Sequence, residues 1–140
     1  MKFPSGEETI KNGLVIVRMI LVLGLFLLPG RAAAVSPADM ERLKATSECP
    51  NCNLNGANLG GANLDNANLS GAYLGGANLS KANLSAADLV DADLTGAKLN
   101  KAYLGGAKLG GAILDDALLS GAIWIDGTKC REGSVKSCTR

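Results

Sequence analysis

The sequence predicts an all-β solenoid, a chain that coils around one narrow core, and three observations carry this prediction. A five-residue pattern repeats without interruption from residue 52 to residue 126. Aromatic residues make up only 4% of the 140-residue chain, so Leu and Ala must build the core. The 18 glycines supply residues that tight turns demand. The length suits a single domain with one modest core.

Each five-residue unit places a large apolar residue at its centre and a small residue two positions earlier. The small residue is Cys52 in the first unit and Ala in every later unit, from Ala57 to Ala122. Fixed-period self-similarity is the signature of a repeat architecture. The central residues are therefore the predicted core columns: Leu54, Leu59, Leu64, Leu69, Leu74, Leu79, Leu84, Leu89, Leu94, Leu99, Leu104, Leu109, Leu114, Leu119 and Trp124.

A period of five fits neither an α-helix nor a straight strand. On a helix, a step of five residues rotates the side chain by about 140° net, which scatters the leucines around the circumference. On a strand, Ala and Leu share a face, but the next Ala, three residues further on, points to the other face. The chain must therefore bend after each Leu, where turn-forming residues stand in most units. We expect a charge at Leu84 to unfold the chain and a change at the outward Asn83 to be nearly silent.

The unit itself resembles that of a known family. Residues 57–61 (ANLGG) and 87–91 (ADLVD) are similar to the A-(D/N)-L-x-x unit of the pentapeptide-repeat family. The resemblance implies a right-handed quadrilateral parallel β-helix with four units per coil, hence just under four coils in residues 52–126. Leucines twenty residues apart would then stack at the strand spacing of about 4.8 Å. The flanks at 49–52 (CPNC) and 124–130 (WIDGTKC) resemble those of family members from photosynthetic bacteria and thylakoid lumens.

Residues 1–34 have the features of a signal peptide. A weakly cationic segment precedes ten residues, from Met19 to Leu28, that are apolar except for Gly24. A Pro-Gly break and three alanines follow, as at a cleavage site. We therefore expect cleavage before Val35 and export to a periplasm, a thylakoid lumen or the exterior. The alternative is membrane anchoring by an uncleaved segment with Arg18 at the interface, although a spanning helix needs about 20 apolar residues.

Both ends of a solenoid need caps because they expose the core of the terminal coils. In residues 35–51, Ser36 is a predicted helix N-cap and Pro37 the first helical residue. A short helix to about Ala45 would cover the first coil with Met40 and Leu43. Residues 127–140 lose the repeat phase and form the predicted C-terminal cap with a disulfide loop.

All four cysteines lie in these caps, and exported chains are oxidised. Bonds between the two caps would span roughly 15–20 Å, whereas a disulfide needs Cα atoms within about 7 Å. We therefore favour Cys49–Cys52 and Cys130–Cys138. One alternative is a redox role for the first pair, which would need a βαβ context. Another is a four-cysteine zinc site, which meets the same distance objection.

The composition argues against an enzyme. The chain has no histidine, the commonest general base and metal ligand. We predict no catalytic residue, no metal site and no cofactor. The acidic groups at Asp88, Asp91 and Asp93, like the pair Asp115 and Asp116, are interpreted as solvated turn and face positions.

The charge of the chain also limits its partners. Residues 35–140 carry 10 basic and 11 acidic side chains, so we predict no nucleic-acid partner and no membrane association after cleavage. Lys81, Lys98 and Lys101 are interpreted as solubility charges.

Two function classes remain. In the first, the chain is a non-catalytic binding or structural module whose flat faces present side chains to an unknown partner protein. The alternative is a DNA-mimic, gyrase-protecting protein, which the family resemblance also brings in. The near-neutral charge, the export signal and central Leu, where those members often use Phe, disfavour this alternative.

The outward position before each central residue becomes apolar at the C-terminal end, where Ile113, Leu118 and Ile123 follow Lys108. Such residues are seldom left in water. Either residues 127–140 fold back over them, or they form a contact surface, for a homo-oligomer or for a partner. The tail looks too polar to cover three faces.

Overall fold

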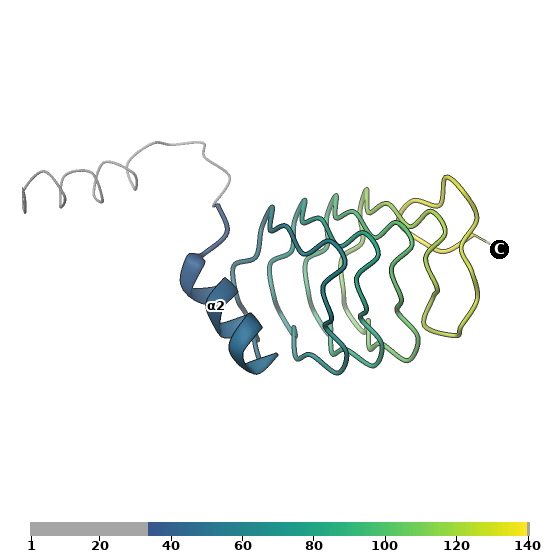
Figure 1. The fold of residues 1–140 in the computed structure, drawn as a ribbon. Helices are drawn as coiled ribbons and strands as arrows, with labels where there is room; N and C mark the ends of the chain where they lie inside the picture. The colour runs from purple at the N-terminus through teal and green to yellow at the C-terminus, as the bar shows by residue number, and fades with distance from the viewer. Residues whose placement is uncertain (1–33, 140) are drawn as a thin grey trace, which may run out of the picture. The chain divides into compact units, whose positions relative to one another are not determined.

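The structure, a computed structural model, describes residues 34–139 (Figure 1). A helix, α2 (Pro37–Thr46), precedes a stack of coils that lie side by side. The predicted signal segment falls outside the described residues except for Ala34, so its cleavage stays a prediction.

Helix α2 begins at the predicted proline and ends one residue beyond the predicted end. The Ser36 hydroxyl accepts a hydrogen bond from the backbone N–H of Asp39 at 3.3 Å. Ser47 terminates the helix in the left-handed conformation, with φ 56°, and donates to the Leu43 carbonyl. Leu43 is buried in the core, and the Asp39 carboxylate accepts from the backbone N–H of Asn53 in the first coil at 2.9 Å. The helix therefore covers the N-terminal end of the stack.

The coils are joined by parallel bridges between residues twenty apart, from Glu48 with Asn68 to Tyr103 with Ile123. The backbone N–H of Leu54 donates to the Tyr73 carbonyl at 2.8 Å, and Tyr73 donates in return to Cys52 at 2.9 Å. Each coil therefore contains four five-residue units. Within the described residues every bridge is isolated, so the coils contain no continuous strand.

The chain bends at the two residues after each central residue. The second of the two has a positive φ in most units, which glycine adopts without a steric cost. The non-glycine residues there have φ between 54° and 61°: Asn51, Asn66, Lys81, Ala86, Asp91, Lys101 and Asp116. An outward Asn or Asp before the central residue locks this turn, as when Asn68 Oδ1 accepts from the backbone N–H of Ser70 at 3.2 Å.

The central leucines form the core. Those from Leu54 to Leu104, together with Leu119, are buried. Each contributes on the order of 1.5–3 kcal/mol. Leu109, Leu114 and Trp124 are also central residues but are only half-buried. Leu109 and Leu114 are not fully covered because the outward residues before them, Lys108 and Ile113, have no bridge partner among the described residues on their C-terminal side.

The C-terminal tail folds back on the other two sides. Leu118 pairs with Val135, and Ile123 pairs with Lys129, both in antiparallel bridges. The tail thus folds back, one of the two alternatives left open by the sequence, through main-chain hydrogen bonds such as that from Lys136 to the Ala117 carbonyl at 3.0 Å. Leu118 still exposes 39% of its surface, and Ile113, which the tail does not pair, exposes 48%.

Two disulfides close the caps, in the pairs favoured from the sequence. The Cα atoms of Cys49 and Cys52 lie 5.3 Å apart, and those of Cys130 and Cys138 lie 4.9 Å apart. No cysteine is free. In this oxidised form none of the four sulfurs is a free thiolate of the kind that a zinc site requires.

Candidate functional site

Outward residues twenty apart form four lateral faces of the solenoid, which the chain visits in turn. Faces 1 and 3 are consequently opposite each other, as are faces 2 and 4. Face 1 carries Asn53, Tyr73, Asp93 and Ile113; face 2 carries Asn58, Asn78, Lys98 and Leu118; face 3 carries Asn63, Asn83, Tyr103 and Ile123; face 4 carries Glu48, Asn68, Asp88 and Lys108.

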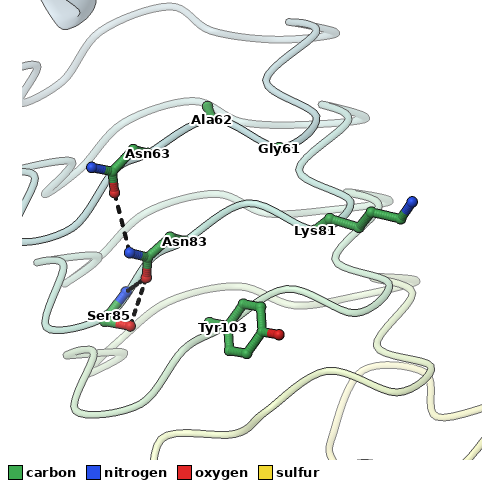
Figure 2. A pocket seen from close by; sticks show the side chains of 7 residues that line it. All are labelled: Gly61, Ala62, Asn63, Lys81, Asn83, Ser85 and Tyr103. Atoms are coloured by element: carbon green, nitrogen blue, oxygen red, sulfur yellow. Dashed lines mark hydrogen bonds between the residues drawn. The ribbon is translucent and has the colours of Figure 1, made fainter.

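Face 3 begins with an asparagine ladder. Asn83 Nδ2 donates to Asn63 Oδ1 at 3.1 Å, which links two successive coils. Asn83 Oδ1 accepts from the backbone N–H of Ser85 at 3.1 Å and from its hydroxyl at 2.6 Å (Figure 2). Asn83 therefore stabilises the local turn, which the sequence-based expectation of a nearly silent position overlooked.

Tyr103 interrupts this ladder in the next coil. Its side chain is 54% exposed. An open hollow of about 500 Å³ lies between Tyr103 and the preceding coils, where Asn63, Lys81 and Asn83 line it (Figure 2). A second hollow of about 240 Å³ lies toward the C-terminal end and is lined by Tyr103, Ile123, Lys129 and others. The tyrosine thus stands between two depressions on one face.

Four lysines gather beside face 3, and we call them the lysine edge: Lys81, Lys98, Lys101 and Lys129. Lys81 and Lys101 occupy the turn between faces 2 and 3, one coil apart, and Lys98 lies on face 2. None of the four forms an ion pair with a described residue, since the ion pairs there involve Lys44, Lys108 and Lys136.

Lys129 reaches the lysine edge from the C-terminal tail. Gly121 occupies the same turn position as Lys101, one coil later, so the space beside it shows which side chains meet there. A Cβ atom built on Gly121 would lie 3.4 Å from Lys101 Cγ. The same position would lie 3.9 Å from Lys129 Cε and 3.8 Å from Glu132 Oε1. Two cations and one carboxylate therefore meet at the C-terminal end of this edge.

Asp88, Asp91 and Asp93 lie at or beside the diagonally opposite turn, between faces 4 and 1. Asp91 occupies that turn. Asp88 Oδ2 lies 3.4 Å from Lys108 Nζ on face 4. Asp93 Oδ1, on face 1, accepts from the backbone N–H of Thr95 at 2.9 Å. The lysine edge and this group of three carboxylates therefore lie on opposite sides of the solenoid.

A further ion pair fastens the tail. Lys136 Nζ lies 2.6 Å from Asp115 Oδ1. The hydrogen bond to Asp115, with the charge of that carboxylate, raises the pKa of Lys136 above the ordinary 10.5, and Asp116 adds to this effect.

Within residues 34–139 no cluster of three or more His, Cys, Asp or Glu side chains is arranged to hold a metal ion. In that same part of the chain no helix has the length and apolarity that a membrane span requires.

The sequence interpretation did not single out Tyr103 or Lys129. The replacement of the usual Asn or Asp by Tyr in one unit could have identified the first. Nothing in the sequence could have identified the second because the tail is out of phase with the repeat.

The chain belongs to the pentapeptide-repeat family. Eight copies of the family's pentapeptide repeat match residues 48–85 and 87–123, which is more than half of the chain. The fold is accordingly the right-handed β-helix of that family. No curated protein sequence gives a significant match.

Several solved structures are similar to the chain. A pentapeptide repeat protein from the Arabidopsis thaliana thylakoid lumen is 28% identical over 62% of this chain and 60% of its own, with a TM-score of 0.55. The match therefore spans less than two thirds of that protein. A pentapeptide repeat protein from Nostoc PCC 7120 is 32% identical over 66% of this chain and 84% of its own, with a TM-score of 0.36. The plasmid-mediated fluoroquinolone resistance protein QnrB1 is 24% identical over 54% and 42%, with a TM-score of 0.40.

Proposed function

We propose that the chain is a non-catalytic module that binds a partner protein through its lateral faces in an exported compartment. The observation that carries the proposal is a pair of exposed tyrosines on opposite faces. Tyr73 exposes 52% of its surface and Tyr103 exposes 54%, at positions where most units have Asn or Asp. Tyrosine is among the residues that contribute most to protein–protein binding energy.

The scaffold beneath these tyrosines favours binding. Each coil is hydrogen-bonded to its neighbours along every face, and the leucine columns below are buried. A surface that is already ordered loses little conformational entropy when a partner docks. A lateral face can therefore bind a partner without reorganising.

The chemistry of the side chains supports a non-catalytic role. The chain has no histidine, and both pairs of cysteines are consumed in disulfides. A nucleophile paired with a general base, the minimum for covalent catalysis, would have to be built from other groups.

Two observations support export. Both disulfides would form and persist in an oxidising compartment. The likeness to a protein of the thylakoid lumen points the same way. A periplasm or a thylakoid lumen therefore suits the chain, with residues 1–34 as the predicted signal.

The alternative, a DNA mimic that protects gyrase, is less well supported. A mimic of nucleic acid requires negative charge along its surface, whereas residues 35–140 are almost neutral. The lysine edge also runs along one side of the coils. The distribution of charge favours a protein partner.

The proposal is tested by affinity capture from the exported fraction with the full-length chain tagged at its C-terminus. A Leu84→Asp chain, which should not fold, serves as the background control. A partner that is retained by the native chain and lost by Tyr73→Ala or Tyr103→Ala, with melting unchanged, supports binding by a lateral face. Retention of no protein above the unfolded control overturns the proposal.

A further inference from the structure

We infer that the lysine edge and Tyr103 together bind an acidic segment of a partner protein. This inference rests on the proposed function and adds to it a face, an anchor and the chemistry of the partner. Four observations carry it: unpaired charge, tolerated backbone strain, an exposed aromatic ring between two hollows, and the position of the opposing carboxylates.

The first observation is that the lysine edge is predominantly cationic, with Glu132 at its C-terminal end as the one carboxylate described beside it. Its four ammonium groups have no ion-pair partner among the described residues. Lys81 and Lys101 project from turns one coil apart, so their charges lie near each other. Adjacent like charges repel, and an acidic partner relieves that repulsion.

The second observation is that two of these lysines occupy strained backbone. Lys81 has φ 61° and Lys101 has φ 59°, in the left-handed region that favours glycine. In the same turn, the preceding and following coils have Gly61 and Gly121. Other units have Ala86, Asn66 or Asp91 in the same conformation, so the turn accepts lysine at a modest cost and glycine can replace it without a change of backbone.

The third observation is the aromatic ring. Tyr103 lines both hollows of face 3; Lys81 lines the first of them and Lys129 lines the second. A tyrosine that projects from a flat face offers a large contact area and one hydroxyl, as binding hot spots do. Side chains of a bound segment would fill the hollows on both sides of the ring.

The fourth observation identifies the occupant as another protein. The carboxylates around Asp91 lie on the diagonally opposite turn, so a second copy that used them would bind head to tail. Such a heterologous contact would build a ring or an open filament of many copies. A separate acidic segment satisfies the lysine edge with a closed, one-to-one contact.

Glu132 provides an internal check on the sign of the partner. Its carboxylate lies beside Lys101 and Lys129 at the end of the lysine edge. An acidic partner must approach this carboxylate, which opposes binding. Replacing Glu132 by Gln should therefore strengthen the contact.

The experiment places the photo-crosslinking residue benzoylphenylalanine at position 103 or at position 73 of the full-length chain. After irradiation of the exported fraction, mass spectrometry identifies the crosslinked peptide of the partner. We expect crosslinks from position 103 to an acidic segment and few from position 73. Crosslinks only from position 73, or crosslinks from 103 to a segment that is not acidic, overturn the inference while the proposed function stands. An absence of crosslinks from both positions, together with failed affinity capture, overturns both.

Purified variants then measure the contact with the crosslinked segment as a synthetic peptide. Lys81→Gly with Lys101→Gly removes two charges and reproduces residues that the turn already uses at positions 61 and 121. This double variant should bind about tenfold more weakly, and Glu132→Gln should bind more tightly. Tyr103→Ala should also bind more weakly than the native chain, because it removes the proposed aromatic anchor. Equal binding by the native chain and the double variant overturns the role of the lysines.

Two other occupants are tested in parallel. Sedimentation with vesicles of phosphatidylglycerol and phosphatidylcholine in equal parts tests a membrane surface. Sedimentation velocity of the native chain at low salt tests filaments of the chain itself. Binding to the vesicles, or filaments that the double lysine variant abolishes, overturns the assignment to an acidic protein segment.

Discussion

Replacing Leu84 by Asp should prevent the chain from folding. Leu84 is fully buried in the middle of its column, between Leu64 and Leu104, which are also buried. Loss of a buried leucine side chain costs about 2–5 kcal/mol. A buried carboxylate without a partner costs several kcal/mol more. Together these costs approach or exceed the roughly 5–15 kcal/mol that stabilises an ordinary domain.

The matched control places the same charge one residue earlier. In Asn83→Asp the carboxylate can still accept from the backbone N–H of Ser85, as Asp93 does from Thr95. The amide donor to Asn63 is lost, which costs about 1 kcal/mol. We expect its melting temperature, followed by circular dichroism, to fall by about 4–8 °C. Similar melting of the two variants would refute the assignment of inward and outward positions.

A third variant tests the open end of the core. Leu109 is a central residue like Leu84 but is only half-buried, so a carboxylate there can reach water. Leu109→Asp should therefore fold, unlike Leu84→Asp, and melt at a lower temperature than the native chain. If it fails to fold, the C-terminal end is covered on that side as well.

The remaining predictions concern the C-terminal cap. Cys138→Ser opens the loop to Cys130 and should cost about 2–3 kcal/mol in urea unfolding, and an unchanged midpoint would mean that the bond is dispensable. The pKa of Lys136 is raised above 10.5 in the folded chain, so its pair with Asp115 stabilises the fold fully below that value and loses its effect as pH rises through the raised pKa. The native chain should melt at a higher temperature than Asp115→Asn below this pKa, and the two should melt alike once the pH exceeds it. A difference that persists above the raised pKa would contradict the role of the ion pair. We further propose that any homo-oligomer forms through the C-terminal coil at Ile113, which the tail does not pair. Ile113→Asn should then give a monomer in equilibrium sedimentation, whereas an unchanged mass would exclude this contact.

Much of the fold could be predicted because the repeat is a local rule. The pattern of Ala and Leu fixes which side chains point inward, and the turn residues fix where the chain bends. Ser36 and Pro37 likewise mark the start of the capping helix through local hydrogen bonding. Because each of these features depends on neighbouring residues alone, the sequence of a single unit is enough to predict it.

The candidate site could not be predicted in the same way. Lys101 and Lys129 meet only because the tail reverses over face 3 and pairs Lys129 with Ile123. That reversal depends on main-chain hydrogen bonds at a coil end, which carry no side-chain pattern. The sequence left open whether residues 127–140 fold back or leave a contact surface, and the tail pairs with Leu118 and Ile123 but not with Ile113.

The architecture itself indicates where function resides. The leucine columns supply the stability, and an outward Asn or Asp locks each turn, so any other outward residue gives up a hydrogen bond. Tyr103 cannot form this side-chain hydrogen bond to the turn. Lys81 and Lys101 adopt a backbone conformation that costs on the order of 1 kcal/mol each. These three departures from the repeat lie in adjoining coils of the same side. Their position together on one side is why we propose the lysine edge and Tyr103 as the place to look for the partner.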